Sequence, residues 1–565
     1  MAKMVVLITL LFSSLVRGQN LVLNGDMESL THWDCWGFNC ELTTDHHSGH
    51  HGIKATGRTM YYMGPSQILT GVHPGGRYWV EGYVKLLNDE QGKIGQKVDL
   101  ELAVTFTDGT ISYIPVASQP LVRASDGWVQ IIGDFSAPSK AIKNTRIYFQ
   151  GASAGVSFIV DDMSITPIVA NQYWRAESDS VIERLRKSDI KFEFTLENGI
   201  SSNQVEIDII QTKKSFPFGT AVSADDYVHG DSRYQDFINK HFNWAVSEAS
   251  LKWDIMEPAK GQINYKRAFD MIYKLLQNGK KIRAHNVVWS EPKYVPQWVR
   301  ALTGNTLKNT VQQRIQDIVG RTKNLVEHWD VDNENLHGFW FQDTLHDRDY
   351  NLDIFRIAHQ AGPNVKLFLN DYDVVALGSL TTAYRDQAVR FKNANVGLYG
   401  VGVQCHFTAN TAPDPTLIKK HLDIISEAGL PIWVTEFDVM ASDEHTRADW
   451  YETALRAFYG HPAVEGIMLW GFWSKKHWRG EPAALVSGDS FTLNAAGQRF
   501  LHLTEDEWMT KETHRLDQSG TSFTTRGFHG DYEAVVKVNG KEVTSLRQYF
   551  TLESSPKAVS VHVHQ

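Results

Sequence analysis

The sequence lacks the features that would tie it to nucleic acid, to a bound metal or to a membrane. Its 565 residues carry a formal net charge of −9, and no run of basic residues occurs that would bind a phosphate backbone. No set of cysteines and histidines has the spacing of a zinc site, and no Asn-x-Ser/Thr sequence offers an acceptor for N-glycosylation. Nucleic acid is therefore not expected as a partner, and no zinc or catalytic metal site is expected.

Cysteine is scarce, with only three in the chain. Cys35 and Cys40 flank four residues, and a local disulfide between them is expected in an oxidising compartment. Cys405 is left over in an apolar stretch, which predicts a buried free thiol. His406 follows it directly, but successive side chains of a strand point to opposite faces, so the two are not expected to form a catalytic pair.

Residues 1–18 have the pattern of a signal peptide. Lys3 gives a positive start, residues 4–16 are almost wholly apolar, and small residues precede a cleavage point ahead of Gln19. The apolar run is too short to span a bilayer, and no later stretch is long enough. We expect a secreted, extracellular, soluble protein that acts as a monomer and has no membrane partner.

Residues 19–168 predict an all-β module. Short runs of alternating apolar and polar residues recur between turn-forming clusters, with no helical periodicity among them. They lie at 78–84, 100–106, 128–132, 145–149 and 157–162. This pattern favours a β-sandwich of the jelly-roll type.

Residues 169–215 differ in character from the module. A charged stretch with a short helical pattern predicts a linker, and two strand-like runs, 191–196 and 204–210, follow it. We expect these two runs to pair as a β-hairpin ahead of the next domain.

Strand-like and helical segments alternate over residues 216–509. Eight strand candidates occur, at 216–222, 242–248, 281–289, 327–334, 366–372, 400–406, 431–439 and 466–472. Eight strands alternating with helices over about 290 residues predict a (β/α)8 TIM barrel of the α/β class. An open doubly wound sheet is the alternative, but the glycine-rich phosphate loop of a dinucleotide-binding sheet is missing. Residues 510–565 return to a β pattern and predict a small C-terminal β subdomain, too short to be stable alone.

Polar and aromatic side chains gather at the predicted carboxyl ends of these strands, where barrel enzymes keep their active sites. In strand order they are Glu248, Lys252, Trp253, His285, Trp289, Asn333, Glu334, Asn370, Asp371, Tyr372, Gln404, His406, Glu436, Asp438, Trp470, Trp473 and Trp478. A single glutamate at a strand end is more often a surface or capping group. Two glutamates on one rim, together with His406, Gln404 and several tryptophans, favour a single active site.

Such a set suits glycoside hydrolysis. Two carboxyl groups flank the glycosidic bond in these enzymes, one as the acid and the other as the nucleophile or base. Amide and imidazole donors bind ring hydroxyls, and indole faces stack on sugars. The high count of 17 tryptophans fits this role and fits core packing as well. The reaction needs no cofactor.

The barrel region resembles glycoside hydrolase family 10, the endo-β-1,4-xylanases. The resemblance rests on Trp329-Asp330-Val331-Asp332-Asn333-Glu334, Asn370-Asp371-Tyr372, Gly402-Val403-Gln404-Cys405-His406, Thr435-Glu436-Phe437-Asp438 and Trp470-Gly471 with Trp478, and it extends upstream to Phe242. It covers residues 216 to 505 with the family's order and spacing.

This resemblance implies a retaining mechanism in which Glu334 is the acid/base and Glu436 the nucleophile. His406 and Asp438 would form the hydrogen-bond network that keeps Glu436 ionised, and Asn333 would hold the 2-hydroxyl of the sugar. The resemblance further implies that seven residues bind the substrate: Glu248, Lys252, His285, Trp289, Gln404, Trp470 and Trp478.

Four positions depart from the family pattern. Ala249 stands where the family has Asn, Ser290 where it has His, Pro292 where it has Gln, and Ser474 where it has Asp. None of them removes the catalytic pair, but they would alter the distal subsites that help such an enzyme select xylose over glucose. We therefore expect a broadened substrate range that includes β-1,4-glucan.

Residues 19–168 resemble the carbohydrate-binding modules of the family 4/9/22 type. The motifs are Asn24-Gly25-Asp26-Met27-Glu28, Ala55-Thr56-Gly57-Arg58-Thr59, Tyr61-Tyr62 and Asp161-Asp162-Met163. Candidate stacking residues are Trp33, Trp36, Tyr61, Tyr62 and Trp128, and each is about as often a core residue. Tyr61 and Tyr62 are favoured because neighbours on a strand cannot both face inward. Modules of this type sometimes hold a structural calcium ion, for which Asp26, Glu28 and Asp161 would supply ligands.

Together these patterns predict a secreted endo-β-1,4-glycanase that acts on plant cell-wall polysaccharide, foremost an endo-β-1,4-xylanase. Two alternatives remain open. One is a β-1,4-glucanase or an enzyme with both activities, and the other is a non-catalytic polysaccharide-binding protein. The intact pair of Glu334 and Glu436 speaks against the last.

Overall fold

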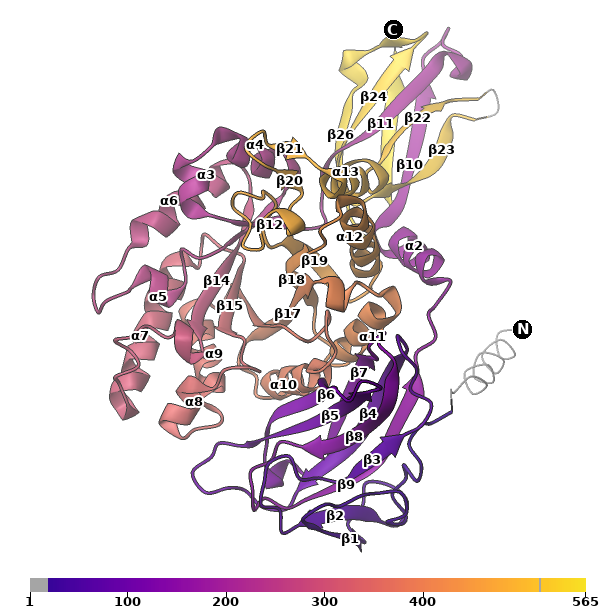
Figure 1. The fold of residues 1–565 in the computed structure, drawn as a ribbon. Helices are drawn as coiled ribbons and strands as arrows, with labels where there is room; N and C mark the ends of the chain where they lie inside the picture. Colours follow the sequence, from indigo (N-terminus) through magenta and orange to yellow (C-terminus); the bar gives the residue numbers. More distant parts are fainter. Residues whose placement is uncertain (1–18, 518–519, 565) are drawn as a thin grey trace.

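The computed structural model describes residues 19–517 and 520–564, and the predicted signal peptide, 1–18, lies outside the described residues. A central barrel carries an N-terminal β-module on one side and a second β-unit, which includes the C-terminal strands, on another (Figure 1). Within the described range, no helix is long and apolar enough to cross a membrane.

The N-terminal module is a two-sheet sandwich, as predicted. One sheet has the order β1-β2-β9-β4-β7 and the other the order β3-β8-β5-β6. The strands are β1 (Asn39–Thr43), β2 (Gly52–Thr56), β3 (Ser66–Leu69), β4 (Arg77–Leu86), β5 (Gln96–Phe106), β6 (Ile111–Val122), β7 (Val129–Ser136), β8 (Ile142–Gln150) and β9 (Phe158–Pro167). In β5, Val98, Leu100, Leu102 and Val104 are buried while the residues between them are partly exposed, so alternation builds the core between the sheets.

The eight predicted barrel strands close in sequence order into a parallel barrel. They are β12 (Phe218–Val222), β13 (Trp244–Ser247), β14 (Lys281–Trp289), β15 (His328–Asn333), β16 (Lys366–Asp371), β17 (Leu398–Phe407), β18 (Ile432–Val439) and β19 (Val464–Leu469). Every residue of β18 is buried because helices cover the outside and side chains fill the inside. A small cluster that includes Trp244, Phe368, Trp433 and Met468 packs together, apart from the main hydrophobic core.

The barrel helices bury one face each. In α6, Ala268, Met271, Ile272 and Leu275 are buried at helical spacing, and the Asn264 side chain caps the first turn by accepting from the Arg267 backbone N–H. The helices are α3 (Ala224–His229), α4 (Ser232–His241), α5 (Trp253–Met256), α6 (Tyr265–Gln277), α7 (Gly304–Thr322), α8 (Trp340–Leu345), α9 (Tyr350–Ala361), α10 (Thr381–Asn393), α11 (Pro415–Ser426), α12 (Glu444–Tyr459) and α13 (Ala495–His502). A two-stranded ribbon, β20 (Val486–Ser487) with β21 (Thr492–Leu493), follows β19.

The predicted hairpin of residues 169–215 is wrong, although both of its strands exist. After α2 (Trp174–Leu185), β10 (Lys187–Leu196) lies between β23 (Ser522–Phe528) and β27 (Lys557–Val563). The next strand, β11 (Val205–Lys214), lies between β22 (Lys511–Arg515) and β24 (Gly530–Val538) in a second sheet that also contains β25 (Lys541–Glu542) and β26 (Gln548–Leu552). Figure 1 shows both purple strands among the yellow C-terminal ones.

The C-terminal strands are therefore not an isolated appendage. Phe192 of β10 and Ile207 of β11 share one apolar core with Val536 and Val561, which come after the barrel. A local hairpin would have left both apolar faces without a second layer, so the more distant pairing is favoured. Strand alternation is visible in a sequence, but the partner of a strand is not.

Candidate active site

A cleft of 750 Å³ opens where the barrel strands end. It brings together most of the barrel residues predicted to act on a substrate: Glu248, Lys252, His285, Trp289, Glu334, Gln404, His406, Glu436, Trp470 and Trp478. Asn333 and Asp438 are fully buried directly behind this lining. The rim position of the cleft is the one expected for a barrel enzyme.

Glu334 follows the last residue of β15 and has a left-handed backbone, with φ of 55°. A left-handed backbone is costly for a residue that has a side chain. The Glu334 N–H donates to the Asn370 carbonyl at 2.9 Å, which helps to hold this conformation. The carboxyl group accepts from Trp289 Nε1 at 3.0 Å and from Gln404 Nε2 at 3.1 Å. Burial, together with the negative charges of Asp371 and Glu436, raises the pKa of Glu334 to about 7.

Glu436, on β18, is shifted in the opposite direction. Burial by itself would raise its pKa, but hydrogen bonding from His406 and the positive charges of His285, His406 and Lys252 outweigh burial and hold the pKa below its usual value. One carboxylate oxygen accepts from Asn370 Nδ2 at 3.0 Å, and the other lies 3.2 Å from His406 Nε2. The group is therefore held as an anion.

His406 links two carboxylates. Its Nδ1 lies 3.0 Å from Asp438 and its Nε2 3.2 Å from Glu436. Burial opposes its charge, but the two carboxylates raise its pKa to about 9, so the imidazolium donates to both. Asp438 also accepts from Trp478 Nε1 at 2.7 Å and pairs with Arg479 at 3.1 Å. This network matches the one implied by the family resemblance.

Asn333 presents an unused donor. Its Oδ1 accepts from Asn370 Nδ2 at 2.9 Å, while its own Nδ2 is buried and meets no acceptor in the described part of the chain. An orphan amide at this place is suited to a ligand hydroxyl. Asn370 connects Asn333 with Glu436, a role that was not predicted; its position at the end of β16 was the available signal.

One wall of the cleft carries a stacked aromatic pair that was not predicted. Trp289 and Tyr294 lie face to face, with ring centroids 3.5 Å apart and an interplanar angle of 21°. Lys252 Nζ lies 5.0 Å from the centroid of the Trp289 ring. Pro292 begins the short 3-10 turn that ends at Tyr294, so this departure from the family pattern shapes the wall.

The other three departures from the family pattern differ in their position relative to the cleft. Ala249 lines the cleft. Ser290 is fully buried and donates to Asp332 at 2.6 Å, and Ser474 accepts from the Gly488 N–H at 2.9 Å. Ser290 and Ser474 are not part of the cleft lining, so of the four departures only Ala249 lines the cleft.

The N-terminal module has a pocket of its own, of 620 Å³. Trp36, Tyr61 and Tyr62 line it with 71%, 59% and 51% of their surface exposed, and Tyr113 and Tyr148 join them. Tyr148 could have been found by alternation, because its neighbours Ile147 and Phe149 are core residues. Tyr61 and Tyr62 lie in a turn, so the expectation that they share a strand is wrong although both are exposed.

Two other candidate tryptophans do not reach this pocket. Trp33 is 7% exposed and belongs to the module core. Trp128 is partly buried beside His47, with ring centroids 5.9 Å apart. The predicted stacking role of Trp128 therefore finds no support in its position.

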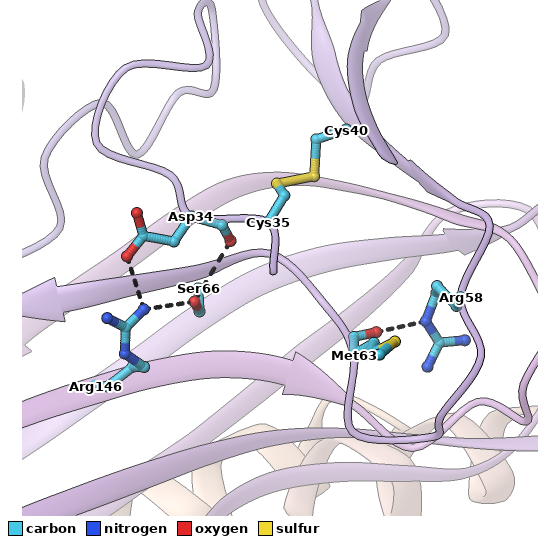
Figure 2. The surroundings of a disulfide bond; sticks show 7 residues. All are labelled: Asp34, Cys35, Cys40, Arg58, Met63, Ser66 and Arg146. Atoms are coloured by element: carbon cyan, nitrogen blue, oxygen red, sulfur yellow. Dashed lines mark hydrogen bonds and ion pairs between the residues drawn. A yellow bond between two sulfur atoms is a disulfide. The ribbon is translucent and has the colours of Figure 1, made fainter. Parts of the chain in front are cut away.

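The predicted disulfide joins Cys35 and Cys40, and Cys405 is a buried free thiol. The bridge closes the loop that contains Trp36, and Figure 2 shows Asp34 beside the bridge, bound to Ser66 and Arg146. The Arg146 guanidinium lies 4.5 Å from the centroid of the Trp36 ring. The loop and the arginine together orient this indole over the pocket.

Two of the three acidic residues proposed as calcium ligands are engaged elsewhere. Glu28 accepts from the His50 and His51 backbone, and Asp161 from that of His47 and Ser48. Among the described residues, no group of three or more His, Cys, Asp or Glu side chains is arranged to hold a metal ion. The geometry gives the calcium prediction no support.

A (β/α)8 barrel whose rim holds two carboxyl groups in different surroundings is the arrangement that glycoside hydrolases use. The model of glycosyl hydrolase family 10 matches residues 208–498, and the chain belongs to this family. A carbohydrate binding domain model matches residues 19–155.

Curated relatives match most of this chain. Endo-1,4-beta-xylanase 3 of Arabidopsis thaliana is 34% identical over 85% of this chain and 63% of its own length. Anti-sigma-I factor RsgI6 of Acetivibrio thermocellus is 37% identical over 68% of this chain and 50% of its own length. The chain thus spans about half the length of the curated relatives it matches. Among solved structures, the CBM22-1-GH10 modules of xylanase 10B from Clostridium thermocellum, complexed with xylohexaose, match 87% of this chain and 98% of theirs at 17% identity, with a TM-score of 0.46.

Proposed function

We propose that this protein is a secreted endo-β-1,4-xylanase that cleaves xylan with retention of anomeric configuration. The observation that carries the proposal is that Glu334 and Glu436 line one cleft in different surroundings. Trp289 and Gln404 bond to Glu334, whose pKa is raised to about 7, while Asn370 and His406 bond to Glu436, whose pKa is lowered. Several relatives of this chain carry the name endo-1,4-beta-xylanase.

The reaction would run in two steps. Glu334 donates its proton to the glycosidic oxygen while the Glu436 carboxylate attacks the anomeric carbon, which releases the first product and forms a glycosyl ester. Glu334, now ionised, takes a proton from water, the resulting hydroxide attacks the anomeric carbon, and Glu436 leaves as the carboxylate. Both steps use protein groups and water alone, and we propose that no metal or cofactor takes part. The Asn333 amide would donate to the sugar.

The N-terminal module would bind the same polysaccharide. Its pocket presents the exposed aromatic faces of Trp36, Tyr61 and Tyr62 beside the charged groups of Glu101 and Arg146, and such faces suit stacking on sugar rings. In this proposal the protein acts as an extracellular monomer, and residues 1–18 direct its secretion.

Product analysis on xylan and on soluble cellulose, with anomeric configuration followed by NMR, tests the proposal. The expected outcome is a range of xylo-oligosaccharides whose first-formed reducing ends have the β configuration. First-formed α products would contradict the retaining mechanism, and the absence of hydrolysis would favour the polysaccharide-binding alternative.

A second activity, on β-1,4-glucan, is favoured by Ala249. A glucose unit carries a hydroxymethyl group that xylose lacks, and the short Ala249 side chain leaves more room in the cleft than an asparagine would. Initial rates on carboxymethyl-cellulose for the natural chain and for Ala249→Asn test this point. Equal rates for both proteins, or no rate for either, would remove the glucanase candidate.

A further inference from the structure

The loop between β16 and α10, residues 372–380, has one side in the catalytic cleft. Tyr372, Asp373, Ala376 and Leu377 all line the cleft. The loop is partly tied to itself, since the Leu380 N–H donates to the Asp373 carbonyl at 3.0 Å. The position of this loop therefore sets the shape of one cleft wall.

The other side of the same loop contacts the N-terminal module. The Ser118 N–H of β6 donates to the Ser379 carbonyl at 2.7 Å. A methyl group added at Gly378 would lie 2.1 Å from Asp134 Oδ1 and 2.3 Å from His421 Nε2. The module and the loop thus approach so closely that a side chain at position 378 would displace Asp134 or His421.

His421 of α11 connects the module to the loop through its ring. Its Nδ1 lies 2.8 Å from the Val375 carbonyl and its Nε2 lies 2.7 Å from Asp134 Oδ1 of β7. Both partners are oxygen atoms, so the ring links the loop carbonyl to the module carboxylate. The His421 and Asp134 side chains are 2% and 12% exposed, so water competes little for these bonds. Val375 is adjacent to Ala376, which faces the cleft.

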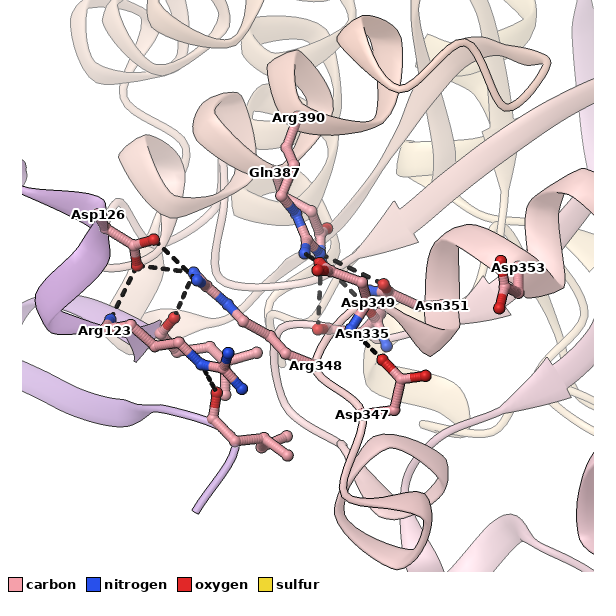
Figure 3. A network of polar contacts seen from close by, with 12 residues as sticks. Arg123, Asp126, Asn335, Asp347, Arg348, Asp349, Asn351, Asp353, Gln387 and Arg390 are labelled. Atoms are coloured by element: carbon pink, nitrogen blue, oxygen red, sulfur yellow. Dashed lines mark hydrogen bonds and ion pairs between the residues drawn. The ribbon is translucent and has the colours of Figure 1, made fainter. Parts of the chain in front are cut away.

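A second contact reaches the loop that follows Glu334. Arg348 binds both carboxylate oxygens of Asp126 in the module, at 2.8 and 2.7 Å, and the Leu121 carbonyl at 2.9 Å (Figure 3). Three residues along the chain from Arg348, Asn351 Nδ2 donates to Asn335 Oδ1 at 2.6 Å. The residue before Asn335 is Glu334.

We propose that the N-terminal module is a positioning element of the catalytic cleft, in which Asp134, acting through His421, fixes residues 372–380 for substrate binding independently of the module's own sugar pocket. This inference rests on the proposed xylanase function and adds a second role for the module. A loop that lacked these bonds would be less ordered before the substrate binds, and the cost of ordering it would weaken binding.

The expected defect is therefore in KM rather than in kcat. Glu334 and Glu436 are held by Asn370, Gln404 and His406, which lie inside the barrel. Losing one hydrogen bond to the loop should raise KM about fivefold. The catalytic pair should keep its geometry, so kcat should stay within about twofold of the unmodified value.

The test compares Asp134→Ala with Asp134→Asn in the full chain. Both are made in a Trp36→Ala background, so that the module pocket takes no part. With xylohexaose as the soluble substrate, Asp134→Ala should raise KM about fivefold, while Asp134→Asn, which keeps an acceptor, should restore most of the affinity. Hydrogen exchange in residues 372–380 should be faster in Asp134→Ala than in Asp134→Asn.

Two further variants make the test decisive. Arg526→Ala breaks exposed ion pairs to Glu183 and Asp189 at the C-terminal unit, away from the cleft, and should leave KM unchanged. Gly378→Ala disrupts the same contact by a change on the barrel instead of the module, so it should reproduce the defect of Asp134→Ala. It replaces the Asp134→Ala variant if Asp134→Ala fails to fold. Unchanged KM and unchanged exchange in folded Asp134→Ala or Gly378→Ala would overturn the proposal. If the unmodified chain fails to cleave xylohexaose, the xylanase function fails instead, and the exchange rates still decide whether the module holds the loop.

Discussion

The catalytic cleft and the module pocket have similar volumes, 750 and 620 Å³, but they present different surfaces to a sugar. In the cleft, His406 bonds to Glu436 and Gln404 bonds to Glu334, and the pKa values of Glu334, Glu436 and His406 are shifted. In the module pocket, Trp36 and Tyr61 are more than half exposed.

This difference shows what each task demands of the fold. Catalysis needs charges that are fixed before the substrate arrives, and burial provides this by excluding water and separating the pKa values of two like groups. Binding needs only flat apolar faces at a suitable spacing, which an open sheet can display. Variants of each site should therefore fail in different assays.

The largest effect is expected for Glu436→Ala. Removing the attacking carboxylate should lower kcat on xylan by about 10⁵-fold or more, as reducing-sugar release would show. Xylan binding through residues 19–168, followed by affinity electrophoresis, should be unchanged because the module pocket is separate. Azide should partly restore cleavage of an activated aryl xyloside and give a product of inverted configuration. Hydrolysis within tenfold of the unmodified rate would refute the assignment of the nucleophile.

Glu334 should set the alkaline limit of activity. With a pKa of about 7, it loses the proton that it must donate as the pH rises above that value, so kcat/KM should fall there. On the acid side the rate should fall only below the usual range of a glutamate, where Glu436 becomes protonated. In Glu334→Gln the rate on xylan should drop about 10²–10⁴-fold and the alkaline limb should vanish from the pH profile. A retained alkaline limb in this variant would mean that another group is the acid.

A smaller effect, confined to the module, is expected for Trp36→Ala. Loss of this exposed indole should weaken xylan binding about tenfold in affinity electrophoresis. Cleavage of soluble xylo-oligosaccharides should stay unchanged, since Trp36 does not line the cleft. Trp128→Ala is the matched control, because this residue lies outside the pocket and its loss should not affect binding. Equal loss in both variants would place the sugar elsewhere on the module.

The smallest effect is expected when Cys35 and Cys40 are both replaced by serine. A disulfide that closes so short a loop contributes about 2 kcal/mol to the free energy of unfolding, so thermal unfolding of the module should shift downward. Xylan affinity should fall about two- to threefold, since Arg146 still holds Trp36 in part. Reductant should reproduce both changes in the unmodified chain and do nothing further to the double variant.

The sequence was enough to predict the barrel and its rim. Eight periodic segments and the polar residues that end them are local signals, and the barrel closes them in order, so Glu334, Glu436 and His406 meet as expected. Tyr294 was missed because its contact with Trp289 depends on a turn that the sequence marks only with a proline.

Features that depend on distant pairing could not be predicted. Nothing near β10 or β11 indicates partners that follow the barrel, so the local hairpin was the simplest expectation. In the same way, the contact between Asp134 and His421 joins two domains, and no sequence pattern in either segment predicts it.

The pairing of β10 with β27 has a consequence for how the chain is made. Ile190 pairs with Lys557, so 367 residues (557 − 190) separate the two partners. Until β27 has been synthesised, the apolar side of β10 lacks part of its packing partner. The β-unit that combines strands from before and after the barrel therefore stays incomplete. Only a chain that includes its final strand can complete this unit. A product truncated after the barrel would expose apolar strands, and the quality control of the secretory route that we propose would remove it.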